Sequence, residues 1–455
     1  MSFNTINPTT EEIIREYLEF TESEVDNKIT SAHKRFGEWK NTSFAHRSKL
    51  MLNAAKILRD KKKDYAGLMA LEMGKPLAQG VSEAEKCAWC CEYYAENAEK
   101  MLSDENVQTQ MSRSFISYQP IGAVLAIMPW NFPFWQVFRF AAPALMAGNV
   151  GVLKHARNTM GCAEAIEEIF LTAGFPESVF TNLVIGSSMV NKVIEHEFIK
   201  AVTLTGSTPV GRQVASKAGS LIKKTVLELG GNDAYVVLED ADLDATAETC
   251  VTARLINSGQ SCIASKRFIV SKKVLNEFEN LFIEKIKTKK MGNPFDSSVY
   301  VGPQARKDLQ LDLHSQVEQS VSMGANLRIG GRLPEDKGYF YSPTVLTNVQ
   351  KGMPAYDEET FGPVAAIIPA ESDEDAIDKA NDSVFGLGAA VFTRNVEKGV
   401  EIAKNRINAG CCFVNDFVKS DPRLPFGGIK LSGYGRELSY FGIREFVNIK
   451  TICVI

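Results

Sequence analysis

The stretch AVTLTGSTPVGRQVASKAGSLIKKTVLELGG, residues 201–231, carries a pattern that predicts the fold class. An apolar run leads into Gly206-Ser207, a helical stretch begins near Pro209, and a second apolar run ends at Glu228 before a pair of glycines. Proline suits the first turn of a helix, where its missing N–H is not needed. Apolar strands that alternate with helices predict a parallel sheet covered by helices on both faces.

The same alternation extends in both directions. Upstream lie the apolar runs AVLAIMPW, VGVLKH and NLVIG, and downstream lie AYVVLED, RFIVSKK, AAIIPA, AAVFT and GCCFVND, the last of which resembles a buried strand. Helices are predicted over residues 242–256 and 274–290, and two long helices over 46–101 with a break at Gly74-Lys75-Pro76. We therefore predict an α/β protein with two sheets of similar size.

Composition excludes several classes of partner. The 455 residues are 45% hydrophobic and 23% charged, with a formal net charge of −4 and a pI near 5.9. The charge gives no cluster of basic residues that would bind a nucleic acid. No apolar run approaches the roughly 20 residues that span a bilayer. The N-terminus lacks the basic start and apolar core of a signal peptide. We expect a cytoplasmic protein with neither a nucleic-acid nor a membrane partner.

The nine cysteines predict reduced thiols, because their number is odd and no regular framework relates them. Cys87 and Cys90 form a C-x-x-C, but within a stretch of helical composition, and the five histidines do not pair at ligand spacing. We therefore expect no metal.

Two β-prone segments lie outside the alternation. Residues 111–120 precede the first core strand, and REFVNIKTICVI ends the chain. Both are candidates for exposed edges, and an exposed edge invites pairing with a second subunit.

The turn LTGSTPVG, residues 204–211, is a weak signal for a nucleotide. A helix start leaves free N–H groups and the positive end of the helix dipole, which favour a pyrophosphate. An ordinary strand-to-helix turn explains the pattern as well, and no G-x-G-x-x-G follows any predicted strand.

Three side chains are candidates for catalysis. Cys262 lies in the polar loop of NSGQSCIASKRF, residues 257–268, where a thiol can have a lowered pKa and attack a carbonyl carbon. Glu228 ends an apolar strand, where ligands of open α/β sheets bind, although a surface charge there is equally ordinary. Asn131 lies between two prolines and so outside regular structure; its amide either stabilises an oxyanion or caps the next helix.

Taken together, these pieces resemble a known family. The motifs are Pro129-Trp130-Asn131-Phe132-Pro133, Lys154, Gly206-Ser207-Thr208 with Gly211, Glu228-Leu229-Gly230-Gly231, Gly259-Gln260-Ser261-Cys262, Glu359-Thr360-Phe361-Gly362-Pro363 and Pro425-Phe426-Gly427-Gly428. In this order, and over nearly the whole chain, they are similar to the NAD(P)-dependent aldehyde dehydrogenase superfamily.

The resemblance implies a role for each site residue. Cys262 would add to the aldehyde, with the oxyanion held by Asn131 and the Cys262 N–H, and Glu228 would activate water to hydrolyse the thioester left after hydride transfer to the nicotinamide. The residues implied in NAD or NADP binding are Trp130, Lys154, Arg157, Gly206, Ser207, Gly230, Glu359 and Phe361.

The cofactor motif departs from the family pattern at one place. After Lys154 the family often has Pro-x-Glu, whose carboxylate binds the ribose hydroxyls, whereas this chain has His155-Ala156-Arg157. A cation in place of that anion removes repulsion toward a 2′-phosphate, so NADP should be usable, and NAD is not excluded.

The local pattern resembles the succinate-semialdehyde branch of the family. Arg139 lies eight residues after Asn131, where that branch uses an arginine for the distal carboxylate, and Gln136 and Ser420 are placed to add hydrogen bonds. Some members carry a second arginine where this chain has Ile256, and a surface-facing Arg139 is the ordinary alternative.

The resemblance also implies a domain division. A Rossmann-like dinucleotide-binding domain would comprise residues 1–101 and 121–229, and an α/β catalytic domain residues 230–430. A hairpin over 102–120 and a C-terminal strand within 431–455 would form a small β oligomerisation element of a homodimer or homotetramer.

Three readings of function stay open at this stage. The first is oxidation of succinate semialdehyde to succinate. The second is a broad-specificity aldehyde dehydrogenase or one that transfers its acyl group to coenzyme A, against which Glu228 argues. The third is a catalytically silent structural or binding protein, which would not be expected to keep Cys262 and Glu228.

Overall fold

The first of two large sheets carries the strands of the opening stretch. In the computed structural model, which describes residues 1–455, six strands follow the order β19-β9-β8-β5-β6-β7. Five are parallel, and only β19 is antiparallel, against β9. The strands are β5 (Ala123–Met128), β6 (Val150–His155), β7 (Phe180–Asn182), β8 (Ile199–Thr205), β9 (Lys224–Glu228) and β19 (Gly433–Tyr434).

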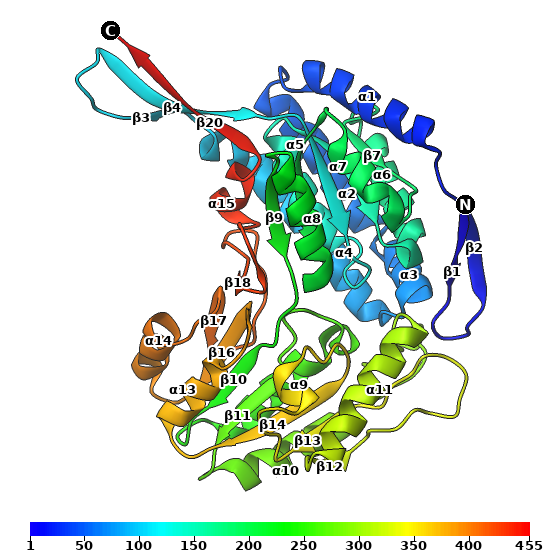
Figure 1. The fold of residues 1–455 in the computed structure, drawn as a ribbon, viewed down its shortest axis with the longest axis vertical. Helices are drawn as coiled ribbons and strands as arrows, with labels where there is room; N and C mark the ends of the chain where they lie inside the picture. Colours follow the sequence, from blue (N-terminus) through cyan, green and yellow to red (C-terminus); the bar gives the residue numbers. More distant parts are fainter.

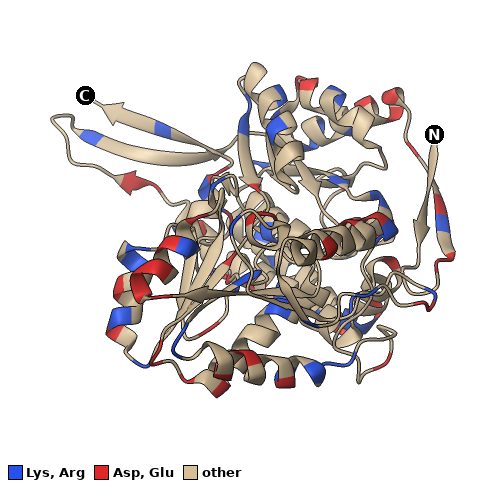
Figure 2. Cartoon of the chain, turned by 60° about the horizontal axis from the view of Figure 1, so that its bottom comes forward, with Lys and Arg blue, Asp and Glu red and all other residues tan.

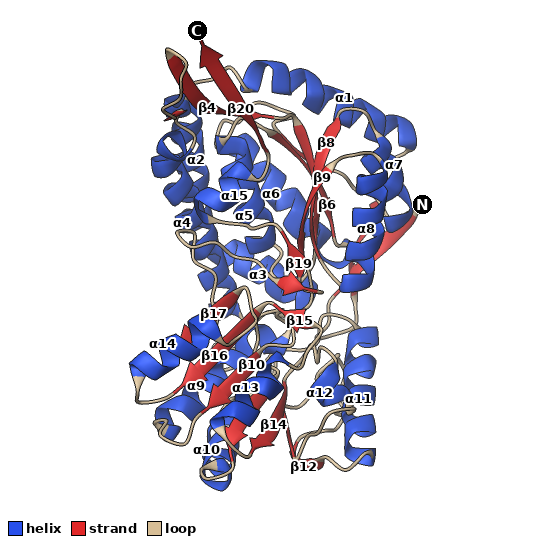
Figure 3. Cartoon of the chain, turned by 60° about the vertical axis from the view of Figure 1, so that its left-hand side comes forward, coloured by secondary structure: helices blue, strands red, loops and turns tan.

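Helices cover both faces of this sheet, as its apolar strands require (Figures 1 and 3). One face carries α1 (Glu22–Trp39), α7 (Val190–Glu195) and α8 (Thr208–Ser220), and the other carries α5 (Trp135–Met146) and α6 (Met160–Thr172). Outside α5 and α6 lie α2 (Phe44–Asp60), α3 (Lys62–Met73) and α4 (Leu77–Met101).

The predicted helix break at residues 74–76 is confirmed. Gly74 has φ 76°, a left-handed conformation that glycine adopts without strain, and Pro76 immediately precedes α4. The segment before the break holds two helices rather than one, because α2 ends at Asp60 and α3 begins at Lys62.

The second large sheet has seven strands in the order β12-β13-β14-β11-β10-β16-β17. All neighbours are parallel except β12 and β13. The strands are β10 (Ala234–Val237), β11 (Arg267–Ser271), β12 (Asn326–Ile329), β13 (Thr344–Thr347), β14 (Val364–Ala370), β16 (Gly388–Phe392) and β17 (Cys411–Val414). The edge strand β17 is half-buried, so the expectation of a buried strand there was wrong.

Two separate apolar clusters lie on the faces of this sheet. One packs against α9 (Leu243–Leu255) and α10 (Leu275–Lys287). The other packs against α11 (Lys307–Ser322), α12 (Pro354–Asp357), α13 (Asp373–Asn381) and α14 (Val396–Asn405). Helices on both faces of two mainly parallel sheets confirm the predicted α/β class.

A β arm projects from the body at the end of the chain (Figure 1). It is a three-stranded sheet in the order β20-β4-β3, formed by β20 (Val447–Val454), β4 (Arg113–Pro120) and β3 (Glu105–Asn106). The two β-prone segments predicted as separate edges therefore pair with each other, and β20 keeps one open edge. The helix α15 (Ser439–Arg444) leads into β20.

Short elements complete the chain. A hairpin of β1 (Ser2–Ile6) and β2 (Ile13–Leu18) lies at the N-terminus, and β15 (Phe385–Gly386) pairs with β18 (Ile429–Lys430). Acidic and basic residues are interspersed over the outer helices (Figure 2). None of the helices combines the length and apolarity that a bilayer crossing demands.

Candidate active site

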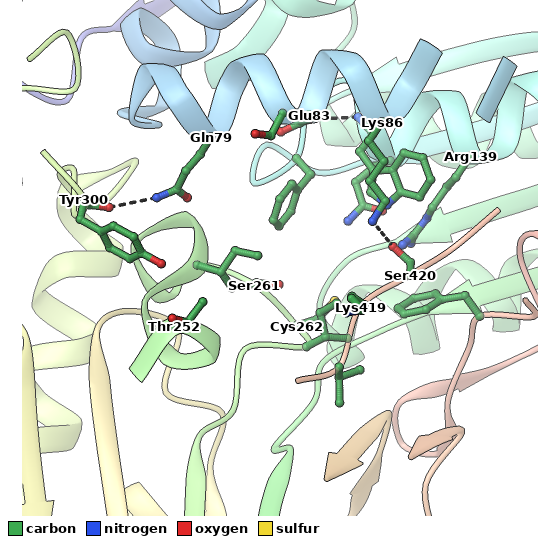
Figure 4. Close-up of a pocket in the computed structure, with 18 residues that line it drawn as sticks. Gln79, Glu83, Lys86, Arg139, Thr252, Ser261, Cys262, Tyr300, Lys419 and Ser420 are labelled. Atoms are coloured by element: carbon green, nitrogen blue, oxygen red, sulfur yellow. Dashed lines mark hydrogen bonds between the residues drawn. The ribbon is translucent and has the colours of Figure 1, made fainter. Parts of the chain in front are cut away.

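A cavity of about 300 Å³ brings Cys262 together with the helices of the first sheet (Figure 4). Its walls come from α4, α5, the loop that carries Cys262, and the segment 418–420. Apolar rings supply much of the lining, so a polar group on its wall meets little competing water. The polar or charged residues used below are Glu83, Lys86, Gln136, Arg139, Cys262, Lys419 and Ser420.

The loop that carries Cys262 begins with three left-handed residues. Asn257, Ser258 and Gly259 have φ values of 53°, 57° and 76° in the short helix η3 (Ile256–Gly259) and at its end. Left-handed backbone is unfavourable for the two residues that have a Cβ, and such strain persists only where surrounding contacts hold it.

Buried cations hold this loop through its carbonyl groups. Arg254 donates to the Ser265 and Gly259 oxygens at 2.9 and 2.6 Å. Lys266 donates to the Ser261 oxygen at 3.0 Å and also to the carbonyl of Cys262. Both cations are fully buried, so the loop is fixed from within the protein rather than by solvent.

Asn131 is joined to the same loop. Its Nδ2 donates to the Gln260 oxygen at 3.1 Å, and its own carbonyl accepts from Asn257 Nδ2 at 2.7 Å. An amide nitrogen has two N–H groups, so one remains for a ligand. Asn131 lies in a bend outside helix and strand, as predicted.

The thiol of Cys262 is only partly exposed, and its pKa is not lowered. Burial raises that pKa to about 12, against the opposing effect of the Arg139 and Lys266 charges. The predicted lowering of the Cys262 pKa was therefore wrong. Desolvation of the loop outweighs the two nearby cations.

Glu228 ends β9 and is 2% exposed. Neither carboxylate oxygen has a hydrogen-bond partner, and Oε1 lies against Gly427. Burial, and then the neighbouring Glu437, hold the pKa of Glu228 well above its usual value, while Arg139 and Arg436 oppose the shift. The alternative of a surface charge is excluded by this burial. Glu228 does not belong to the wall of the cavity that holds Cys262.

A second cavity, of about 580 Å³, lies beside the end of β6. Lys154 and Arg157 line it together with Arg306 and Lys307, so four basic side chains surround one hollow. Arg157 also pairs with the carboxylate of Glu19, which balances part of its positive charge.

The remaining predicted cofactor residues cluster around the ends of β8 and β9. Ser207 precedes α8 without capping it through its side chain, so the first N–H groups of that helix stay available to an anion. The N–H of Gly206 donates to the Glu228 carbonyl at 3.0 Å. A Cβ on Gly230 would lie 2.5 Å from Glu359 Oε2, so a larger residue there would displace the end of the Glu359 side chain.

Glu359 and two aromatic rings complete this region. Glu359 accepts from the Gly231 N–H at 3.0 Å and lies 3.5 Å from Lys266 Nζ. The rings of Trp130 and Phe361 meet edge to face at 5.7 Å. Lys266 thereby connects the loop of Cys262 to the carboxylate of Glu359.

The predicted substrate residues Gln136, Arg139 and Ser420 all line the cavity of Cys262. Arg139 is buried, which excludes the surface-facing alternative. Its guanidinium pairs with Glu437 and donates to Thr205 Oγ1 at 3.1 Å, so its charge is already balanced within the protein.

Comparison with known proteins places the chain in a family. The family model described as the aldehyde dehydrogenase family matches residues 1–452. The chain belongs to the aldehyde dehydrogenase family. It is 49% identical over 454 residues to the probable succinate-semialdehyde dehydrogenase [NADP(+)] of Synechocystis sp., with 100% of both chains covered.

Two further relatives agree with this assignment. The succinate-semialdehyde dehydrogenase [NADP(+)] of Mycobacterium leprae is 46% identical over 457 residues, again with 100% of both chains covered. The crystal structure of succinic semialdehyde dehydrogenase from Streptococcus pyogenes with NADP⁺ superposes with a TM-score of 0.97 at 37% identity, covering 99% of each chain.

Sequence reasoning missed four charged residues of this aldehyde dehydrogenase. They lie in or beside the site and are Lys86, Arg254, Lys266 and Glu437. Arg254 stands among small or apolar residues in a helical stretch, and a charge there was the available signal. Lys86 follows Glu83 and Glu85, so the sequence around it gives no such signal. Nothing in the sequence pairs Glu437 with Arg139, since the two are brought together only by the fold.

Proposed function

We propose that this aldehyde dehydrogenase oxidises succinate semialdehyde to succinate with NADP. The observation that carries the proposal is the single cavity whose wall includes both the Cys262 thiol and the cationic residues Lys86 and Arg139. A thiol can take the aldehyde carbon while a cation across the cavity takes a carboxylate. The names of the relatives that match the whole chain support the same substrate and cofactor.

The first step is attack of the Cys262 sulfur on the aldehyde carbon. The sulfur reacts as the thiolate, so the thiol first gives its proton to water, and the C–S bond then forms. The carbonyl oxygen becomes an oxyanion, for which the free N–H of Asn131 Nδ2 and the backbone N–H of Cys262 are the proposed donors. Donors fixed in advance at a developing charge contribute roughly 3 kcal/mol each.

The residues of the second cavity fit a dinucleotide with an added phosphate. Lys154 and Lys307 have no carboxylate partner and would supply positive charge for a 2′-phosphate, while Arg157 and Arg306 beside them pair with Glu19 and Asp308. We propose that Ser207 and the first N–H groups of α8 hold the pyrophosphate, with Gly206 and Gly230 giving close approach. When bound, the nicotinamide cofactor accepts the hydride that leaves the aldehyde carbon.

The nicotinamide end is assigned to Glu359, Phe361 and Trp130. Glu359 would hold the ribose hydroxyls, and the two rings would flank the nicotinamide. Lys266 contacts both Glu359 and the loop of Cys262, which supports a fixed relation between nicotinamide and thiol.

Glu228 is the proposed base for the second half-reaction. Hydride loss leaves a thioester on Cys262, and a carboxylate that removes a proton from water allows the water oxygen to replace sulfur. Burial raises the pKa of Glu228, which makes it a stronger base once it is ionised. Because Glu228 lies outside the cavity wall, we propose that its side chain turns toward Cys262 at this step.

The distal carboxylate of the substrate is proposed to bind at the Gln136, Arg139 and Ser420 end of the cavity. These three residues are held on α5 and the segment 418–420. These residues would offer the carboxylate hydrogen bonds that an uncharged aldehyde cannot use, which favours the charged substrate.

The domain division and the assembly remain proposals of the same kind. Residues 1–101 and 121–229 would bind the dinucleotide, and residues 230–430 would carry catalysis. The open edge of β20 supports pairing in a homodimer or homotetramer. Nine unpaired cysteines support a reducing, cytoplasmic location.

A steady-state comparison tests the proposed function. We expect the kcat/KM for succinate semialdehyde to exceed that for butanal, a four-carbon aldehyde without the carboxylate, with NADP as cofactor. Turnover should need no added thiol acceptor such as coenzyme A. A wild-type enzyme that shows no preference between the two aldehydes would overturn the substrate assignment.

A further inference from the structure

Lys86 is the one cation on the cavity wall without a carboxylate partner. Arg139 pairs with Glu437, and Lys419 pairs with Asp416 at 2.5 Å. Lys86 Nζ donates to Ser420 Oγ at 2.8 Å and lies 4.4 Å from the centre of the Trp135 ring. These contacts orient the ammonium but do not balance its charge.

The acidic groups nearest to Lys86 are already engaged. Glu83, three residues earlier on α4, pairs with Lys75, and it accepts the backbone N–H groups of Phe134 and Trp135 at 3.0 and 2.9 Å. Asp421, beside Ser420, accepts from Arg423 at 2.9 and 2.7 Å. No oxygen of either carboxylate is bonded to Lys86.

The other titratable groups around Lys86 do not supply a negative charge. Cys87 and Cys90 flank it on α4, and burial raises both thiol pKa values, which keeps these groups neutral at ordinary pH. Arg139 faces it from α5 and repels it. Burial and this repulsion lower the pKa of Lys86 to about 8, a shift that an added anion would oppose.

Lys86 and Arg139 converge on Ser420 from two helices (Figure 4). The Ser420 hydroxyl accepts from Lys86, so its own O–H is free to donate to an anion. An ammonium and a hydroxyl that touch each other on a largely apolar wall form a two-point site for one carboxylate.

We propose that Lys86, with Ser420, is the charge that selects a carboxylate-bearing aldehyde, while Glu437 balances Arg139. The inference deepens the proposed function and rests on it. Arg139 then contributes hydrogen bonds and orientation at the same end of the cavity. The net positive charge that an ω-carboxylate meets there belongs to Lys86.

The test is the preference of Lys86→Met for succinate semialdehyde over butanal, compared with wild type. Methionine keeps the length and apolar stem of lysine and removes its charge. We expect kcat/KM for succinate semialdehyde to fall at least tenfold, mainly through KM, while kcat/KM for butanal changes less than twofold. Succinate, added as an inhibitor of butanal oxidation, should bind at least tenfold more weakly.

Two further variants test whether the charge at residue 86 is responsible for the preference. Lys86→Arg restores a cation, and we expect it to recover most of the preference. Lys419→Met removes a lysine of the same wall whose charge Asp416 already balances, so the preference should change less than twofold. Butanal turnover reports whether each variant is folded.

The outcomes separate this inference from the function on which it rests. If wild type prefers succinate semialdehyde and Lys86→Met keeps that preference, the role of Lys86 is wrong and the function stands. Equal loss for both aldehydes would also overturn the role of Lys86, because charge selection affects only one of them. If wild type itself shows no preference, both proposals fail.

Discussion

The two walls of the catalytic cavity use buried charge in different ways. Behind the loop wall, which Ser261, Cys262 and Ile263 form, Arg254 and Lys266 direct their N–H groups at backbone carbonyls of the loop. On the helix wall, Lys86 and Arg139 point into the cavity itself. Arg254 and Lys266 fix the backbone of the loop, whereas Lys86 and Arg139 face a ligand bound in the cavity.

The difference separates positioning from recognition. A cation whose hydrogen bonds go to the backbone fixes geometry for every substrate alike. A cation that faces a cavity without a carboxylate partner distinguishes charged from uncharged substrates. Variants of the loop wall should therefore affect succinate semialdehyde and butanal equally, and variants of the helix wall should not.

The largest effect is expected from Cys262→Ala, which removes the group that the loop wall positions. Oxidation of both aldehydes should fall by roughly 10⁴ or more, as removal of a catalytic nucleophile does elsewhere. NADPH formation measures the loss. Binding of succinate to this variant, measured by thermal shift, should be retained and would show that the helix wall is intact. Residual turnover above one-hundredth of wild type would contradict the role of Cys262.

A second large effect is expected from Lys266→Met on the loop wall. Freeing the Ser261 and Cys262 carbonyls should displace the sulfur, and a misplacement of about 1 Å reduces rate roughly 100-fold. We expect kcat to fall for both aldehydes with their ratio unchanged. Lys272→Met is the matched control, because that lysine forms only an exposed pair with Glu371.

A change in the ratio of kcat for the two aldehydes in Lys266→Met would contradict this division between positioning and recognition. It would mean that this cation senses the distal end of the substrate, and the loop wall would then take part in recognition.

Glu437→Gln should increase the selectivity of the helix wall for a charged substrate, because it removes the carboxylate that balances Arg139. The preference for succinate semialdehyde over butanal should rise by about 1 kcal/mol, a factor of roughly five. The variant should also unfold at lower temperature, since it leaves a buried cation uncompensated, and succinate should restore part of that loss. An unaltered preference would show that Glu437 does not mask Arg139.

A smaller effect is expected from pH. Lys86 loses its charge as pH rises through its lowered pKa of about 8. Dividing kcat/KM for succinate semialdehyde by that for butanal cancels the titration of Cys262, and the quotient should fall above pH 8. Lys86→Arg should keep the quotient level to higher pH. A flat wild-type quotient between pH 7 and 9 would count against charge recognition by Lys86.

Much of the fold was accessible from the sequence because strand and helix alternate with clear apolar patterns. The strand before Gly206 and the strand that ends at Glu228 are both observed, as is the break at Gly74. The β-prone patterns alone did not predict the pairing of β4 with β20, because these segments lie more than 300 residues apart and such a pattern does not specify its partner.

The sequence predicted the candidate site residues but not how their charges are paired. Motifs identify Cys262, Glu228 and Asn131 by residue type and order. They do not show that burial raises the Cys262 pKa, that Glu437 balances Arg139, or that Lys86 faces the cavity unpaired. Those properties depend on distances between segments far apart in the chain, which only the folded structure supplies.

We propose that Cys262 carries the acyl group and that Glu228 releases it. Mass spectrometry of Glu228→Gln after reaction with succinate semialdehyde and NADP tests it most directly, because removal of the base should trap the thioester. We predict the added mass of one succinyl group on the peptide that contains Cys262, and none in Cys262→Ala carrying the same change. An unmodified Cys262 peptide, or the added group on another residue, would contradict the account.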